Sequence, residues 1–383
     1  MDFSEVIGQR HLKSHFKNTL ANDRVPHAQL FVGAAGSGVL PMAIAYAKEI
    51  LCAAHEKDSP AYQTAAAKVA KLAHPDLHFV YPVNTNDSVK KHPVSKLFMQ
   101  DWRTFIEKNA YGSLFDWLQE LGIENKQGAI NVDEAADILK SLSLTSYEGG
   151  YKVFIIWMAD KMNTACANKI LKIVEEPPAK TVLLLLTEQE EQLITTIRSR
   201  CQKVDFPLLS EHEISIYLSD NQGVESSTAQ RIAHQAQGDL NRALRLLSDD
   251  GSSAIFLDWF VSWVRTAFKA KGNKGAVTQL LKWSEQVAGQ NRETQKKFLS
   301  FCDDTFRQAL LLNYKSDPLV FFPENANFDL KKFAPFVHQN NIFEISKAIQ
   351  DASYHIERNG NTKIIFSDLS IQLTRLIHRK ELV

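Results

Sequence analysis

The sequence has few cysteines, no long apolar run and no excess of either charge. It contains only four widely scattered cysteines, Cys52, Cys166, Cys201 and Cys302. This scatter offers neither a disulfide framework nor a Cys-x-x-Cys metal site, and it suits a reducing compartment. No segment approaches the roughly 18 apolar residues that suggest a membrane-spanning helix. The opening residues, MDFSEVIGQ, lack the basic and apolar regions of a secretory signal. We therefore expect a cytoplasmic protein without a membrane partner.

The charges of the chain balance, with 44 Lys and Arg against 44 Asp and Glu. A protein that binds DNA by itself usually carries a basic excess, so a stand-alone DNA-binding protein is not favoured. The basic clusters at 269–274, 296–297 and 378–380 are interpreted as solvated faces, with contact to DNA as the alternative. A chain of 383 residues is long enough for two or three domains.

The most informative stretch runs from Lys152 to Arg200. Two continuous apolar runs, 153–158 and 181–186, enclose a helical pattern over 164–176 that ends at two prolines. Such runs are typical of parallel strands that helices cover on both faces. We expect an α/β then all-α chain: an α/β domain over 1–207, a small helical domain over 208–250 and a helical domain over 251–383.

A glycine-rich turn follows the first apolar strand, at 28–32, and precedes a helix at 40–52. Strand, turn and helix form the context of a phosphate-binding loop, G-x-x-x-x-G-K-[ST]. Gly33 and Gly38 keep the frame, with Gly36 between them, but Val39 replaces the lysine and Leu40 replaces the hydroxyl residue. The segment Gly36-Ser37-Gly38 is either an ordinary turn or a residual anion-binding nest.

A second departure follows the strand at 153–158. A nucleotide-hydrolysing fold carries acids here that hold Mg²⁺, whereas this chain has Trp157 and Met158. The simplest interpretation is that both side chains pack in space that ATP would otherwise occupy.

Several motifs carry a family resemblance. They are Val6-Ile7-Gly8-Gln9, His74-Pro75-Asp76, Leu171-Lys172-x-x-Glu175-Glu176-Pro177-Pro178, Ser199-Arg200-Cys201-Gln202 and Gly238-Asp239-Leu240. The chain resembles the clamp-loader subunits of bacterial DNA polymerase III, of the AAA+ class, and among them the delta-prime type most. The resemblance is dense over residues 1–250. It implies an AAA+ sheet domain with a degenerate phosphate loop, a small helical lid domain and a helical collar that oligomerises.

The resemblance also implies roles for single residues. The family carries a sensor arginine where this chain has Asn241, so four separate ATP contacts are changed together. Hydrogen bonds to charged groups contribute about 1.5–3 kcal/mol each, and we therefore predict no ATP hydrolysis, no tight ATP binding and no cofactor. The arginine of Ser199-Arg200-Cys201 acts in the family as a finger in the ATP site of a neighbouring subunit. The alternative for Arg200 is an ordinary surface arginine.

The implied partners are the motor subunits and the delta subunit of a clamp loader. The chain would contact the sliding clamp through the complex, and it would contact primed DNA mainly as part of the complex. Relatives often carry a four-cysteine zinc module, but only Cys52, joined by His55, lies in that region, so no metal is expected. Two alternatives remain: an ATPase motor subunit of the same loader, and an AAA+ adaptor of another replication or repair machine. The role of residues 84–128 is open.

Overall fold

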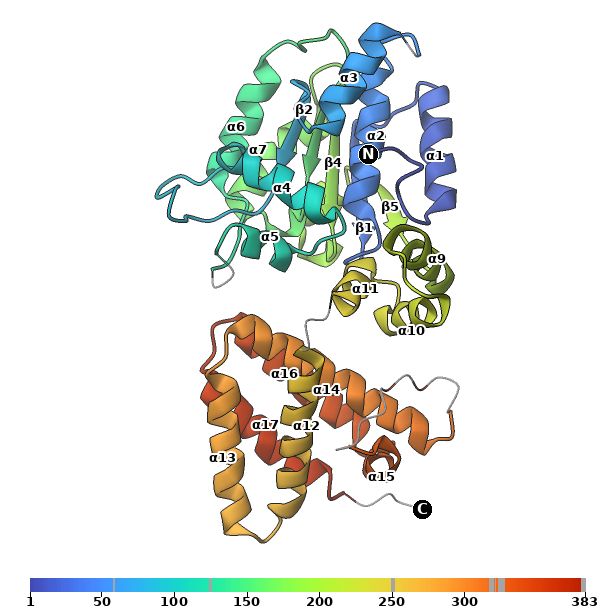
Figure 1. Ribbon diagram of the computed structural model, residues 1–383. Helices are drawn as coiled ribbons and strands as arrows, with labels where there is room; N and C mark the ends of the chain where they lie inside the picture. Colours follow the sequence, from blue (N-terminus) through green and yellow to red (C-terminus); the bar gives the residue numbers. More distant parts are fainter. Residues whose placement is uncertain are drawn as a thin grey trace. The chain divides into compact units, whose positions relative to one another are not determined.

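The computed structural model describes residues 1–57, 59–123, 126–248, 252–316, 320, 322 and 328–379. The chain divides into two compact units, Met1–Leu247 and Ser248–Val383 (Figure 1). Residues 249–251, at the predicted boundary between the second and third domains, lie outside the described part of the chain. The same holds for the last residue of the basic cluster at 378–380.

The first unit is built on a five-stranded parallel sheet with the strand order β2-β3-β4-β1-β5. The strands are β1 (Ala28–Gly33), β2 (Leu77–Val80), β3 (Lys152–Ile156), β4 (Thr181–Thr187) and β5 (Gln202–Phe206). Leu30 of β1 is in register with Leu185 of β4 and Lys203 of β5. Every residue of β3 and β4 is buried, as continuous apolar strands require when both faces are covered.

Alternate residues of the central strands enter two different cores. Ile155 and Leu184 belong to the core on one face, whereas Phe154 and Leu183 belong to the core on the other. The first face packs against α1 (Arg10–Ala21), α2 (Val39–Cys52), α3 (Pro60–Ala70), the 3-10 turn η1 (Ser95–Phe98), α4 (Met99–Asn109) and α5 (Leu114–Glu120). The second packs against α6 (Val132–Ser143), α7 (Thr164–Glu175) and α8 (Thr195–Arg198). Two further 3-10 turns are η2 (Ala159–Lys161) and η3 (Glu190–Gln192).

Three helices complete the first unit around a core of their own. They are α9 (Glu211–Gln222), α10 (Ser226–Ala236) and α11 (Leu240–Leu247). A capping box between Ser210 and Glu213 fixes the start of α9. Gly238, with φ of +86°, lets the chain turn back so that its carbonyl accepts a hydrogen bond from the Leu209 amide. This turn sets α11 against the sheet domain.

The elements of the second unit in its described part are helices and one 3-10 turn. It contains α12 (Ser252–Lys269), α13 (Lys274–Ala288), α14 (Arg292–Asn313), α15 (Leu330–Phe333), the 3-10 turn η5 (Ala334–Phe336), α16 (Ile342–Glu357) and α17 (Thr362–Leu376). Its core is rich in aromatic rings, and Trp263 stacks on Trp283 with their centroids 5.0 Å apart. The predicted fold class, a parallel sheet covered on both faces followed by helices, is confirmed. None of the described helices has the length and apolar character needed to cross a membrane.

Candidate functional site

The candidate site lies where the carboxyl ends of β1, β3 and β4 meet, the usual place for ligands in open α/β sheets. A small pocket with a cavity volume of about 30 Å³, partly open to solvent, occupies this edge. Its described lining is Gly33, Ala34, Ala35, Gly36, Gly38, Val39, Leu40, Pro41, Ala110, Tyr111, Gly112, Trp157, Met158, Leu186, Thr187 and Glu188. The pocket therefore brings the residues of the degenerate loop together with Trp157 and Met158, as the sequence predicted. Asn241, the remaining predicted residue of the degenerate site, is not among them.

The glycine-rich loop is held by this chain's own groups. Gly36 and Gly38 have φ of +70° and +95°, a region that glycine enters without penalty. A Cβ on Gly36 would lie 1.8 Å from Oδ1 of Asp239, so a larger residue cannot be placed there. The Leu240 amide donates to the Gly36 carbonyl at 3.3 Å, and Gln9 Nε2 donates to the Ser37 carbonyl at 2.9 Å. The loop thus connects the sheet domain to α11 and to the N-terminal segment.

The described lining of the pocket offers no positive charge to a polyphosphate. Val39 and Leu40 stand at the start of α2, and no Lys or Arg occurs among the lining residues that the structure describes. The one acidic residue among them is Glu188, and burial raises its pKa to about 7. Burial also raises the pKa of Asp239, whose carboxyl lies beside Gly36. A nucleotide would meet carboxyl groups where a working site offers a cation.

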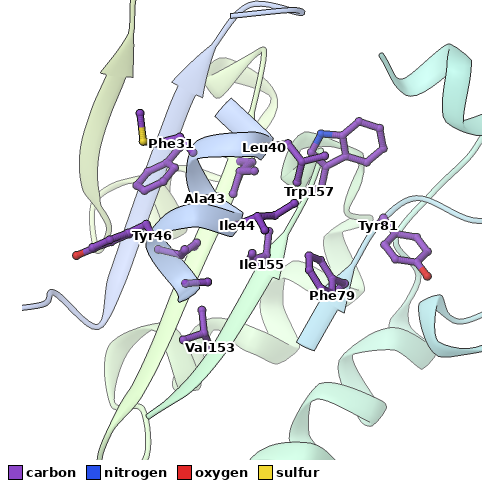
Figure 2. Close-up of a cluster of buried hydrophobic side chains, with 14 of the residues drawn as sticks. Phe31, Leu40, Ala43, Ile44, Tyr46, Phe79, Tyr81, Val153, Ile155 and Trp157 are labelled. Carbon is purple, nitrogen blue, oxygen red and sulfur yellow. The ribbon is translucent and has the colours of Figure 1, made fainter. Parts of the chain in front are cut away.

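Trp157 and Met158 lie just beyond β3, which ends earlier than the sequence predicts. The Trp157 amide still donates to the Val80 carbonyl at 2.8 Å, but Met158 has φ of +54° and turns the chain away. The Trp157 ring packs against Trp102 and Phe105, at centroid distances of 5.2 and 5.8 Å. Figure 2 shows Trp157 at one end of the core cluster, beside Leu40. Both residues are buried, and both also line the small pocket that remains beside the loop. That the pair occupies space a nucleotide would otherwise take stays a prediction.

Tyr111, which the sequence did not single out, occupies the pocket from the segment between α4 and α5. Its hydroxyl accepts a hydrogen bond from the Ile7 amide at 2.8 Å. Its ring lies against the loop, since a Cβ on Gly38 would be 3.2 Å from the ring. Burial raises the pKa of the Tyr111 phenol above its usual range. No periodicity marks this residue, because its partner is 104 positions away in the sequence.

Asn241 faces the same segment and is not among the pocket residues. It accepts from Asn109 Nδ2 at 2.6 Å and donates to Asp116 Oδ2 at 2.8 Å. Arg245 Nη2 also contacts Asp116, at 2.7 and 2.8 Å from its two oxygens. Burial raises the pKa of Asp116, but the charge of Arg245 together with the hydrogen bonds from Ser113 and Arg245 outweighs burial, and the pKa is lowered. The position expected for a sensor arginine therefore serves to hold α11 against α5.

Arg200 lies outside the pocket, in the turn between α8 and β5. Its side chain is 40% exposed, and its Nε lies 2.5 Å from Glu175 Oε1. Arg200 Nη1 donates to the Thr196 carbonyl at 3.0 Å, and Ser199 Oγ donates to the same carbonyl at 3.3 Å. Burial raises the pKa of the Cys201 thiol to about 11, which makes it a packing residue and not a nucleophile.

Within the described residues, no group of three or more His, Cys, Asp or Glu side chains is arranged to hold a metal ion. Cys52 is a buried free thiol. His55 and His74 both approach Glu148 Oε2, at 3.3 and 3.1 Å, and Lys68 Nζ lies 2.6 Å from the other oxygen. This cluster joins the region after α2 to the loop before β3.

Comparison with known proteins places these features in a family. The family model described as DNA polymerase III, delta subunit, matches residues 8–210. DNA polymerase III subunit tau of Bacillus subtilis (strain 168) is 28% identical over 250 residues, covering 64% of this chain and 37% of that protein. Subunit delta' of the same organism is 29% identical over 197 residues, covering 51% of this chain and 47% of that protein. The chain thus spans less than half of the length of either relative. A solved gamma subunit-related protein from Thermotoga maritima gives a TM-score of 0.39 at 13% identity, covering 95% of this chain and 99% of that one; this likeness is too low to carry an argument.

Proposed function

This chain belongs to the DNA polymerase III delta-subunit family, and we propose that it is a non-hydrolysing, delta-prime-type subunit of the clamp loader. In this role it donates Arg200 to the ATP site of a neighbouring ATPase subunit and helps to load the sliding clamp on primed DNA. One observation carries the proposal: the pocket keeps the glycine loop but has an acid, Glu188, and no cation in its described lining.

The lost contacts support the absence of hydrolysis. Phosphoryl transfer depends almost entirely on positioning and on cations that neutralise the γ-phosphate. In this pocket Val39 replaces the lysine and Leu40 the Mg²⁺-binding hydroxyl, while Trp157 and Met158 replace the acids. Tyr111 also lines the pocket. The described lining therefore supplies no cation that could neutralise the developing charge.

The location of Arg200 supports action in trans. Its guanidinium is half-exposed and belongs to no described part of this chain's own pocket. An arginine supplied by a neighbouring subunit stabilises the charge of the transition state without any need for nucleotide in its own chain. The partners proposed are accordingly the motor subunits and the delta subunit, with clamp and primed DNA contacted through the complex.

A second candidate, an ATPase motor subunit, is favoured by the similarity to tau and by the retained loop glycines. It requires that ATP bind beside Glu188 without a lysine. The two candidates differ in whether Arg200 or the chain's own pocket is needed for ATP hydrolysis.

The test is a reconstituted clamp loader that carries Arg200→Ala. We expect single-turnover ATP hydrolysis at the neighbouring site to fall by about 10³-fold or more, the usual contribution of an arginine finger, and clamp loading to fall with it. Arg198→Ala is the matched control, because Arg198 is the last residue of α8, two positions before Arg200, and the described hydrogen bonds of its side chain go only to the Glu190 carbonyl. Unchanged ATP-driven clamp loading with Arg200→Ala would refute the proposed role.

A further inference from the structure

We propose that Glu175 is the positioning residue of Arg200: its carboxylate orients the guanidinium so that one edge is presented to the neighbouring subunit's nucleotide. This inference rests on the proposed function and adds a residue to it. The direct observation is the ion pair between Glu175 Oε1 and Arg200 Nε, at 2.5 Å.

The guanidinium is held at two of its three nitrogens. Nε faces Glu175, and Nη1 donates to the Thr196 carbonyl at 3.0 Å. No hydrogen bond within the described residues uses Nη2. A planar guanidinium with Nε and Nη1 fixed can rotate little, so Nη2 points in one direction. An arginine prepared in this way meets a phosphate with less loss of side-chain entropy than a mobile one.

The backbone on both sides of the ion pair is also fixed. Glu175 is the last residue of α7, and the preceding Val174 is fully buried in the same core as Ile197 of α8. The carbonyl of Val174 contacts His27 Nε2 at 3.1 Å, which satisfies one of the free carbonyls at a helix end. After Arg200 the chain enters β5, which pairs with β1 from Gln202 onward. The carboxylate and the guanidinium are thus carried on rigid elements.

The helix by itself disfavours an acid at this position. The carboxyl end of a helix carries a partial negative charge, so glutamate is destabilising there and lysine or arginine is preferred. α7 nevertheless ends with Glu175, and Glu176 follows as its C-cap. Arg200 supplies the compensating charge for Glu175. The side chain of Glu176 has no such ion pair in the described structure, which makes it a matched comparison.

The test uses the reconstituted clamp loader with Glu175→Gln, Glu176→Gln or Arg200→Ala, each with single-turnover ATP hydrolysis measured against ATP concentration. We expect Glu175→Gln to lower kcat about tenfold, because misplacing a catalytic group by about 1 Å can cost up to about 100-fold. KM for ATP should be unchanged, since the ground-state nucleotide is held by the neighbour. Glu175→Asp should recover part of kcat, and Glu176→Gln should behave as the unmodified complex. A merely structural role would instead lower the unfolding midpoint and complex yield of Glu175→Gln.

The outcomes separate this inference from the function it rests on. If Arg200→Ala lowers kcat and Glu175→Gln does not, the positioning role is wrong while the finger role stands. An increase of kcat with Glu175→Gln also overturns it, because Glu175 would then restrain Arg200 instead of orienting it. If Arg200→Ala leaves kcat unchanged, the proposed function and this inference are both overturned.

Discussion

Glu134 is a buried acid at the start of α6 whose ionisation is coupled to folding. It is only 4% exposed, and its Oε2 accepts a hydrogen bond from the Ser95 amide at 2.7 Å. Burial raises its pKa from 4.5 to about 7, despite the hydrogen bonds from Ser95 that lower it. The folded protein therefore holds a proton on Glu134 at pH values where the unfolded chain has released it.

The stability contributed by this proton has a definite pH window. Below about pH 4.5 the contribution is fully present, and it is lost as the pH rises through about 7. We expect the free energy of unfolding to fall by on the order of 2 kcal/mol across this window because of Glu134. Glu134→Gln keeps an acceptor for Ser95 and should remove that part of the pH dependence in urea unfolding at pH 5 and pH 8. Glu107→Gln, at an exposed position of α4, is the control. If the free energy of unfolding of Glu134→Gln depends on pH as it does in the unmodified chain, the raised pKa of Glu134 is wrong.

The segment containing α4 and α5 is the element that distinguishes this site. Trp102 of α4 and Trp117 of α5 are fully buried against the sheet face, with ring centroids 5.1 Å apart. Between the two helices, Tyr111 enters the pocket, and at their ends Asn109 and Asp116 contact Asn241 of α11. One element therefore packs on the sheet, occupies the pocket and binds the three-helix core of α9, α10 and α11.

Asp116 is the residue on which this attachment depends. Its carboxylate accepts from Asn241 and Arg245 of α11 and closes the capping box of α5 with Ser113. We expect Asp116→Ala to lower the free energy of unfolding by about 2 kcal/mol, the scale of losing a charged hydrogen-bond acceptor and a cap together. Hydrogen exchange in α11 should accelerate. Lys108→Ala removes the more exposed Lys108–Glu120 pair of the same segment and should change stability by less than about 1 kcal/mol. Unchanged exchange in α11 with Asp116→Ala would contradict the attachment.

The elements could be predicted from the sequence to the extent that local patterns determine them. The continuous apolar run at 181–186 predicted β4, observed as Thr181–Thr187, and the two prolines after Glu176 ended α7 as expected. The replacement of the phosphate-loop lysine and hydroxyl residue by Val39 and Leu40 could also be recognised from the sequence, because a phosphate loop is a contiguous motif. The contacts of Tyr111 with Ile7 and of Asp116 with Asn241 join residues 104 and 125 positions apart. Tertiary packing alone creates them, so no local pattern could predict them.

At the scale of the whole molecule, the two units have separate cores. The sheet domain and α9–α11 contribute three hydrophobic clusters, all within the first unit. The described residues of the second unit form one cluster, rich in aromatic rings and built from α12 to α17. Every residue of the candidate site, including Glu175 and Arg200, belongs to the first unit. The nucleotide chemistry proposed here is therefore a property of the first unit, whatever the second unit binds.

We expect that the chain does not bind ATP because several contacts are lost together, and not because of any single residue. The altered contacts come from three parts of the first unit that are far apart in the sequence: the start of α2, the end of β3 and the start of α11. Each lost contact to a charged phosphate removes about 1.5–3 kcal/mol, and several together remove on the order of four decades of affinity. We expect no binding in calorimetric titration with ATP and Mg²⁺ at millimolar concentration, with the motor subunit of the same loader as positive control. Val39→Lys combined with Leu40→Thr should leave binding weak, because Trp157 and Met158 still stand in place of the Mg²⁺-binding acids and Tyr111 still lines the pocket. Micromolar binding by the unmodified chain would support the motor-subunit alternative instead.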